Sequence, residues 1–188
     1  FLLDILTNKK GETDLVERKL MAAQAFSITS SYDTAIFNYF SDEGNETLKY
    51  RFGISNKLRY GENPHQQGFF FGDLERAFAQ HHGKQISYNN LLDIDAAIKL
   101  ILDFDENTFA IFKHLNPCGL AQRPKLLNAW KDALAGDPVS AFGGIIVTLG
   151  IIHKEEAEEI NKLFFEIIIA NGYSAQALEV LKSKKNRI

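Results

Sequence analysis

The segment LRYGENPHQ, residues 58–66, places an arginine and a phenol in one short polar turn. The planar guanidinium of Arg59 can bind a phosphate or a carboxylate through two hydrogen bonds, and Tyr60 stands directly beside it. A plainer interpretation is also open, because Asn63-Pro64 is typical of a turn that only redirects the chain. The residue types alone favour neither interpretation.

A second candidate is FKHLNPCG, residues 112–119, at the end of the apolar run FAIF. In open α/β sheets ligands bind beyond the carboxyl ends of the strands, which is where this sequence places Lys113 and His114. An imidazole exchanges a proton near neutral pH, and an adjacent ammonium stabilises developing negative charge. The alternative is a solvated lysine beside a hydrogen-bonded histidine.

Cys118 follows His114 by four positions, which suggests a Cys–His nucleophile. Pro117 disfavours the helix that would bring the two side chains together, and a lone cysteine is more often a small buried apolar residue. Pro117-Cys118 also resembles half of the zinc deaminase signature. That signature is incomplete, because position 121 is alanine and the HxE element, His153–Glu155, follows the cysteine instead of preceding it.

A third candidate is GDPVSAFGG, residues 136–144, which leads from a predicted helix end into the apolar run GIIVTL. Asp137, Ser140 and Gly143 suit a tight turn where the backbone approaches a ligand closely. Neither GxxxxGK[ST] nor GxGxxG occurs in the sequence, so a phosphate cradle is not indicated. A structural turn is the default interpretation.

The segments that must position these residues alternate between strand and helix patterns. Apolar runs such as IIV and IIIA have no polar face, which is typical of strands covered on both sides of a largely parallel sheet. We therefore predict a three-layer α/β/α sandwich. The predicted strands are residues 47–52, 68–71, 108–113, 144–149 and 166–170, and the predicted helices are residues 93–103, 124–136, 154–163 and 174–184.

A helical segment precedes this domain. Asp14 and Glu17 form a capping-box pattern before a helix that runs to about Phe26, and a second helical segment is predicted at residues 32–40. The turn formers at residues 41–46 interrupt the pattern. They place a domain boundary between residues 46 and 47.

Composition limits the classes of function. The chain has 188 residues, 45% hydrophobic, and 21 basic against 24 acidic residues give a net charge of −3, which disfavours nucleic-acid binding. No apolar run approaches the ~20 residues that span a bilayer, so we expect a soluble protein without a membrane partner. The single cysteine fits a cytoplasmic setting. Since the sequence opens at Phe1 and its one methionine is Met21, we expect a fragment.

Taken in order, the motifs RYGENPHQ, NNLLDIDAA, FKHLNPCG, DPVSAFGG and EIIIANGYSAQALEVLKSKKN closely resemble the AICAR transformylase/IMP cyclohydrolase family of purine biosynthesis. The resemblance covers nearly the whole chain. It implies that residues 1–46 are the C-terminal helices of the cyclohydrolase domain with a linker. Residues 47–188 would be the first of two transformylase subdomains, with a cytidine-deaminase-like fold, and the second subdomain is absent.

The resemblance implies an enzyme that transfers a formyl group from 10-formyltetrahydrofolate to the 5-amino group of AICAR, giving FAICAR, which the cyclohydrolase closes to IMP. His114 would take the proton from the attacking amine, and Lys113 would stabilise the oxyanion or assist proton movement. Arg59 and Tyr60 match the AICAR-binding pair of the family. The further substrate contacts implied by motif position are Asn90, Gly143 and Glu166.

The same resemblance implies a homodimer, no metal for the formyl transfer, and no catalytic role for Cys118. An alternative from another functional class stays open at this point: a nucleotide-binding or dimerisation module that is catalytically incomplete.

Overall fold

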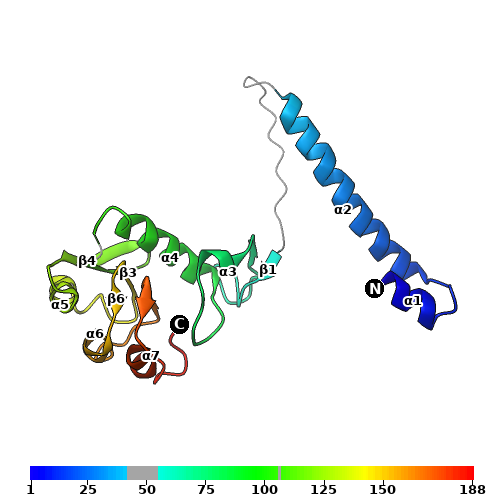
Figure 1. Cartoon of the computed structure of the whole chain (residues 1–188). Helices are drawn as coiled ribbons and strands as arrows, with labels where there is room; N and C mark the ends of the chain where they lie inside the picture. The colour runs from blue at the N-terminus through cyan, green and yellow to red at the C-terminus, as the bar shows by residue number, and fades with distance from the viewer. Residues whose placement is uncertain (42–54, 106) are drawn as a thin grey trace. The chain divides into compact units, whose positions relative to one another are not determined.

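The structure, a computed structural model, describes residues 1–41, 55–105 and 107–188. The chain divides into two units, Phe1–Gly53 and Ile54–Ile188 (Figure 1). The predicted boundary between residues 46 and 47 and the predicted strand at residues 47–52 lie outside the described residues.

The first unit consists of the helices α1, Leu2–Asn8, and α2, Leu15–Phe40. The predicted capping box is confirmed, because the Glu17 N–H donates to Asp14 Oδ1 and the Asp14 N–H donates to Glu17 Oε2, both at 2.9 Å. The prediction of two separate helical segments is wrong, since α2 is continuous. Serine and threonine hydroxyls in its middle bond to carbonyls of the preceding turn, as Thr34 does to Ser30 at 2.7 Å, so these polar side chains find partners within the continuous helix.

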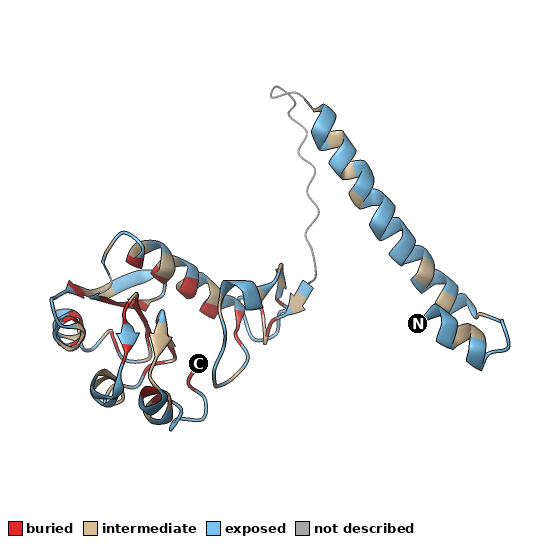
Figure 2. Cartoon of the chain, in the orientation of Figure 1, coloured by how far each residue is buried: buried red, intermediate tan, exposed pale blue. Residues whose placement is uncertain are grey.

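Neither helix of the first unit contains a buried residue (Figure 2). Large apolar side chains such as Phe26 and Tyr39 are exposed along α2. Although α2 has 26 residues, no helix in the described part of the chain combines the length and the apolar character needed to cross a bilayer.

A four-stranded sheet in the order β4-β3-β5-β7 is the centre of the second unit. Its strands are β3 (Thr108–Lys113), β4 (Asn116–Gln122), β5 (Ile145–Thr148) and β7 (Ile167–Ile169). Strand β3 is antiparallel to both β4 and β5, and only β5 and β7 are parallel. The prediction of a largely parallel sheet is therefore wrong. Two residues connect β3 to β4, and so short a connection can join only antiparallel strands.

Helices cover both faces of this sheet, as predicted for an α/β protein. Helix α4 (Tyr88–Ile101) packs on one face. The other face carries α5 (Leu126–Gly136), α6 (Lys154–Ile160) and α7 (Ala175–Leu181). These helices confirm the α/β class, and the closer assignment to a cytidine-deaminase-like sandwich stays a prediction.

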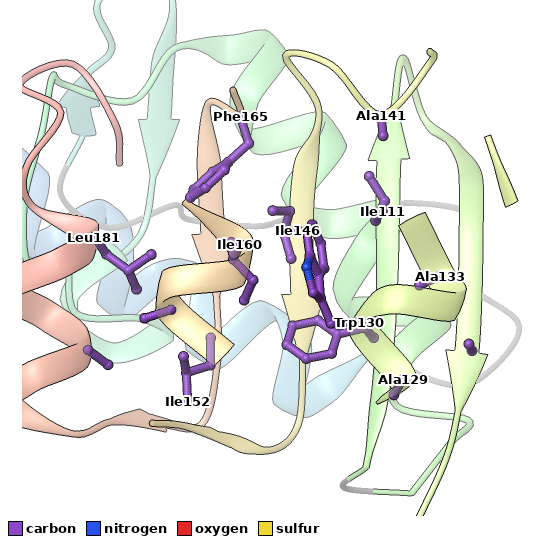
Figure 3. Packing of buried hydrophobic residues seen from close by; sticks show 14 residues of the cluster. Ile111, Ala129, Trp130, Ala133, Ala141, Ile146, Ile152, Ile160, Phe165 and Leu181 are labelled. Carbon is purple, nitrogen blue, oxygen red and sulfur yellow. The ribbon is translucent and has the colours of Figure 1, made fainter. Parts of the chain in front are cut away.

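Two hydrophobic clusters, one on each face, explain why the strand sequences are apolar throughout. Successive side chains of a strand point to opposite faces, so Ala110 and Phe112 pack toward α4 while Phe109 and Ile111 join the cluster beneath α5, α6 and α7. In that second cluster Trp130 meets Phe109 edge to face, with ring centroids 5.7 Å apart (Figure 3). Strand β3 is thereby buried on both sides.

Smaller elements surround the sheet. Strands β1 (Ser55–Lys57) and β2 (Phe69–Phe71) pair antiparallel, which confirms the predicted strand at residues 68–71. The RYGENPHQ motif lies in the loop that connects these two strands. The remaining elements are α3 (Leu74–Ala77), β6 (Ile151–Ile152) and β8 (Gly172–Tyr173), of which the last two pair parallel.

Gly119 in β4 allows the strand to approach α5 closely. A Cβ atom there would lie 1.9 Å from the carbonyl oxygen of Ala133. We predict that Gly119→Ala lowers the free energy of unfolding by about 1–3 kcal/mol or more, because strand and helix must separate. The control is Gly172→Ala, where the nearest atoms are Ile151 side-chain carbons at 3.6 Å and 3.8 Å. Urea denaturation measures both variants, and equal stabilities would contradict this account of the packing.

Candidate functional site

Five of the seven predicted site residues lie at one edge of the four-stranded sheet, and Arg59 and Tyr60 lie in the loop between β1 and β2. Antiparallel pairing brings the C-terminal end of β3 next to the N-terminal ends of β4 and β5, and β7 also begins there. Lys113 and His114 leave β3 at this edge, while Gly143 and Glu166 stand just before β5 and β7. Of the four strands, only β3 has its carboxyl end at this edge, so the predicted site beyond the ends of parallel strands would lie beyond β3 alone.

His114 lies in a strained hairpin turn. Lys113 pairs with Asn116 across the β3–β4 ladder, so His114 and Leu115 alone form the connection. Their φ angles are +51° and +67°, the left-handed values that a type I′ turn requires and that Asn-Gly usually supplies. Such values cost a residue other than glycine about 1–3 kcal/mol and occur preferentially at functional sites.

The ammonium of Lys113 is held beside the GDPVSAFGG turn. Its Nζ donates a hydrogen bond to the carbonyl oxygen of Phe142 at 2.6 Å. The next residue, Gly143, has a φ of +74° and donates its N–H to the carbonyl oxygen of Phe164 at 2.8 Å. The cation of Lys113 and the glycine backbone are therefore neighbours.

Asp137 has a structural role in the same turn. Its Oδ1 accepts the backbone N–H of Ser140 at 2.9 Å. Hydrogen bonds from the Ser140 side chain and backbone hold the pKa of the Asp137 carboxyl below its usual value. This half of the motif thus matches the structural interpretation, whereas Gly143 lies at the site edge.

Asn90 connects the beginning of α4 to the beginning of β7. It completes a capping box with Ser87, accepting the Ser87 N–H and hydroxyl at Oδ1 over 3.1 Å and 2.9 Å. Its Nδ2 donates to Glu166 Oε2 at 3.3 Å, and Lys84 lies 3.8 Å from the same oxygen. The Glu166 N–H donates to Gly144 at 3.0 Å. Asn90 and Glu166 are thereby fixed by both side-chain and backbone contacts.

Arg59 and Tyr60 form a compact pair. The Arg59 guanidinium carbon lies 4.7 Å from the centre of the Tyr60 ring, and Arg59 Nη2 donates to the Tyr60 hydroxyl at 2.9 Å. Backbone bonds attach the pair to the start of α4: the Arg59 N–H donates to the Ile86 carbonyl oxygen at 3.2 Å, and the Tyr88 N–H donates to the Tyr60 carbonyl oxygen at 3.3 Å. The Arg59 side chain has no direct contact with Lys113 among the contacts of the described residues.

One nitrogen of Arg59 has no hydrogen-bond partner in the described part of the chain. This nitrogen, Nε, is buried. A buried, unsatisfied cationic donor is costly, and native proteins rarely keep one without a reason. An anionic group bound at this edge would satisfy it, which fits the first interpretation of the RYGENPHQ loop better than a plain turn.

Cys118 does not resemble a nucleophile. The register of β4 shifts at this residue, and its Sγ lies 3.5 Å from the Ile111 carbonyl oxygen as a weak donor. Burial raises the pKa of the thiol, so the reactive thiolate is disfavoured. The Cys–His hypothesis therefore has no support from the geometry.

His81 and His82 are adjacent histidines, but their contacts are with different parts of the chain and not with a shared metal site. His81 meets the Tyr173 ring edge to face at 5.9 Å, and His82 Nε2 lies 3.3 Å from the carbonyl oxygen of Lys184. Within residues 1–41, 55–105 and 107–188, no group of three or more His, Cys, Asp or Glu side chains is placed to hold a metal ion.

A cavity of about 450 Å³ lies elsewhere in the second unit. Its walls are mainly aliphatic side chains of α4, β5 and β7, such as Ile98, Val147 and Ile169. None of the predicted site residues lines it. The lining also contains polar side chains, among them His82, Lys182 and Arg187. We place the candidate site at the sheet edge because the residues of the recognised motifs lie there and not in this cavity.

Residues 2–188 match the AICARFT/IMPCHase bienzyme family over almost the whole chain. The chain belongs to this family. It is 58% identical over 189 residues to the bifunctional purine biosynthesis protein PurH of Bacteroides thetaiotaomicron, covering 100% of this chain and 37% of that protein. PurH proteins of Lactococcus lactis subsp. cremoris MG1363 and Rhodospirillum rubrum are 43% and 42% identical, over 94% and 98% of this chain. The chain spans 36% and 37% of their respective lengths.

The family resemblance predicted from the motifs is thereby confirmed. Several residues at the edge were nevertheless missed by sequence reasoning. Asp93 of α4 accepts the Leu115 N–H, and Lys84 pairs with Glu166. Phe142 and Phe164 form an exposed ring pair, 5.0 Å between centroids, beside Gly143. Of these residues, only Asp93 could have been found from the sequence. It follows Asn90 by three positions, which places both residues on the same face of a helix.

The depressed pKa of Asp137 predicts a pH-dependent stability. A carboxyl group whose pKa is lower in the folded protein stabilises it above the pKa of the unfolded chain, and this contribution disappears as the pH falls through the folded pKa. We expect Asp137→Asn to be less stable than the unsubstituted protein at pH 7, with the difference disappearing once the pH falls below the ordinary Asp pKa of about 3.9 and through the lower folded pKa. Urea denaturation across this range measures it. A difference independent of pH would contradict the assignment.

Proposed function

We propose that this chain forms part of the site that transfers a formyl group from 10-formyltetrahydrofolate to the 5-amino group of AICAR. One observation supports the proposal above all: Lys113, His114, Gly143 and Glu166, which are far apart in sequence, lie at one edge of the sheet. Hydrogen bonds there connect Lys113 to Phe142 and Glu166 to Asn90. The enzyme would be an AICAR formyltransferase, a one-carbon transferase of purine biosynthesis.

His114 is the proposed general base. The amine of AICAR is a weak nucleophile, because its lone pair is drawn into a carboxamide-substituted ring, and it must lose a proton as it attacks. An exposed imidazole at the end of a rigid strand can accept that proton near neutral pH. Lys113, held next to it by the Phe142 carbonyl, would stabilise the negative charge that develops on the formyl oxygen.

The other side chains would bind and orient AICAR. The nucleotide carries a phosphate, and the unsatisfied Nε of Arg59 offers a donor for an anionic group. Glu166 is already held by Asn90, which would leave its carboxylate positioned to accept from the substrate. The backbone at Gly143 would allow close approach, because no side chain projects there. 10-Formyltetrahydrofolate supplies the formyl group, and we propose no metal for the transfer.

The domain assignment belongs to the same proposal. Residues 1–46 would be the C-terminal helices of an IMP cyclohydrolase domain with its linker, and residues 47–188 the first transformylase subdomain, with a cytidine-deaminase-like fold. In the full-length protein the cyclohydrolase would close FAICAR to IMP. We expect a homodimer by resemblance and a cytoplasmic location, to which the single cysteine is suited.

The coverage of the relatives favours one alternative. Because this chain spans only 36% to 37% of the PurH proteins compared, it could be a nucleotide-binding or dimerisation module that is catalytically incomplete. Turnover distinguishes the two: this module would bind AICAR without forming FAICAR even when 10-formyltetrahydrofolate is present.

Replacing the proposed base tests the mechanism. In the full-length protein that contains this sequence, we expect His114→Ala to lower kcat for formyl transfer by about 10²–10⁴-fold, the usual contribution of a general base. Spectroscopic detection of tetrahydrofolate release follows the reaction. His153→Ala, which removes an exposed imidazole outside the sheet edge, is the matched control and should retain normal turnover. Near-normal turnover of His114→Ala would remove His114 from this role.

Arg59 tests the substrate assignment. We expect Arg59→Ala to weaken AICAR binding by about 10- to 100-fold, equivalent to the ~1.5–3 kcal/mol of a hydrogen bond to a charged group. Arg59→Lys keeps the charge but not the planar fork, so it should restore only part of the affinity. Isothermal titration calorimetry of the full-length protein measures both variants, with Arg76→Ala as an exposed control. Equal affinities in all variants would refute the contact.

A further inference from the structure

The turn that presents His114 is not stable by its own sequence. Type I′ turns are usually formed by Asn-Gly, and here His114 and Leu115 adopt the same left-handed angles. Within the turn, Asn116 Nδ2 donates to the carbonyl oxygen of His114 at 2.8 Å. Leu115 has no hydroxyl or amide with which to satisfy its own backbone, so its N–H needs an acceptor from outside the hairpin.

Asp93 supplies that acceptor. The Leu115 N–H donates to Asp93 Oδ1 at 2.7 Å, a short bond to a charged oxygen across 22 positions of sequence. Bonds of this type are stronger than those between neutral groups. No salt bridge within the described residues involves the Asp93 carboxylate, so its contact with the turn is not secondary to an ion pair.

The place of Asp93 is set by the rest of α4. The Ser87–Asn90 capping box fixes the start of this helix, and the next residue after Asp93, Ile94, is buried against the sheet. Asp93 therefore has little freedom to move. Asn90 and Asp93, separated by three positions, reach opposite sides of the site, one to Glu166 and the other to Leu115.

We propose that Asp93 is a positioning residue of the candidate site: by binding the Leu115 N–H it fixes the β3–β4 turn and thereby the direction in which the His114 imidazole is presented. The proposal rests on the proposed function for the role of His114. The hydrogen bond itself can be tested without any assay of activity.

The first measurement is backbone hydrogen exchange in the whole chain, followed by NMR. Asp93→Ala should accelerate exchange of the Leu115 N–H at least about tenfold, while the core amides of β3 keep their rates. Asp95→Ala is the matched control, because Asp95 lies on the same helix, is exposed and, within the described part of the chain, pairs with Lys99 and not with the turn. An unchanged exchange rate of the Leu115 N–H in Asp93→Ala would show that Asp93 does not fix the turn, whether or not the protein is a transformylase.

The second measurement is steady-state kinetics of the full-length protein. If Asp93 positions the base, Asp93→Ala should lower kcat by about 10- to 100-fold and change the KM for AICAR less than about threefold. Asp93→Asn keeps an acceptor oxygen and should recover most of the loss. Faster Leu115 exchange with unchanged kcat would overturn the positioning role. Equal activity of His114→Ala and the unsubstituted protein would instead refute the proposed function. The hydrogen bond between Asp93 and Leu115 would then still be tested by the exchange measurement.

Asp93→Asn also decides the question if Asp93→Ala does not fold. Its neutral oxygen makes a weaker bond, so Leu115 exchange should rise about threefold and kcat should fall less than tenfold. A lower kcat with unchanged Leu115 exchange, or faster exchange with unchanged kcat, would overturn the proposal, because the hydrogen bond and the placement of His114 would then be independent of each other.

Discussion

Burial of β3 between two layers of helices is the constraint on which the site depends. Phe109 and Ile111 pack into the cluster around Trp130, and Ala110 and Phe112 pack against α4 on the opposite face. A strand packed on both faces is held against rotation about its axis and against movement along it. The residues that immediately follow it are therefore delivered to a defined point, even though they are themselves exposed.

The rigidity of β3 also makes its strained turn possible. A hairpin with left-handed angles at His114 and Leu115 opposes the local preference of both residues, and it persists only if the surrounding structure determines it. The ladder between Lys113 and Asn116 provides one restraint, and α4 provides another through Asp93. The packed core thus holds β3 in place, and the fixed strand determines where the polar side chain of His114 lies at the edge.

Helix α4 has a second role, because it connects parts of the site that the sheet alone would leave separate. Its first turn binds Glu166 through Asn90, and the segment before it pairs with the backbone of Arg59 and Tyr60. At this edge Glu166 is paired with Asn90 and Lys84, and the Asp93 carboxylate accepts the Leu115 N–H, so both carboxylates already have partners. In the proposed function, the cationic groups of Arg59 and Lys113 would suit a substrate that carries an anionic group.

The sequence by itself determined the local elements and the family. The capping box at Asp14, the apolar strand at residues 108–113 and the ordered motifs needed only nearby residues to be recognised. Only the tertiary structure decided that β3 is antiparallel to β5 and that Asp93 binds Leu115. The physical reason is that periodicity and capping depend on neighbours along the chain. Strand direction and long-range hydrogen bonds depend on which distant segments pack together, and no local pattern records that choice.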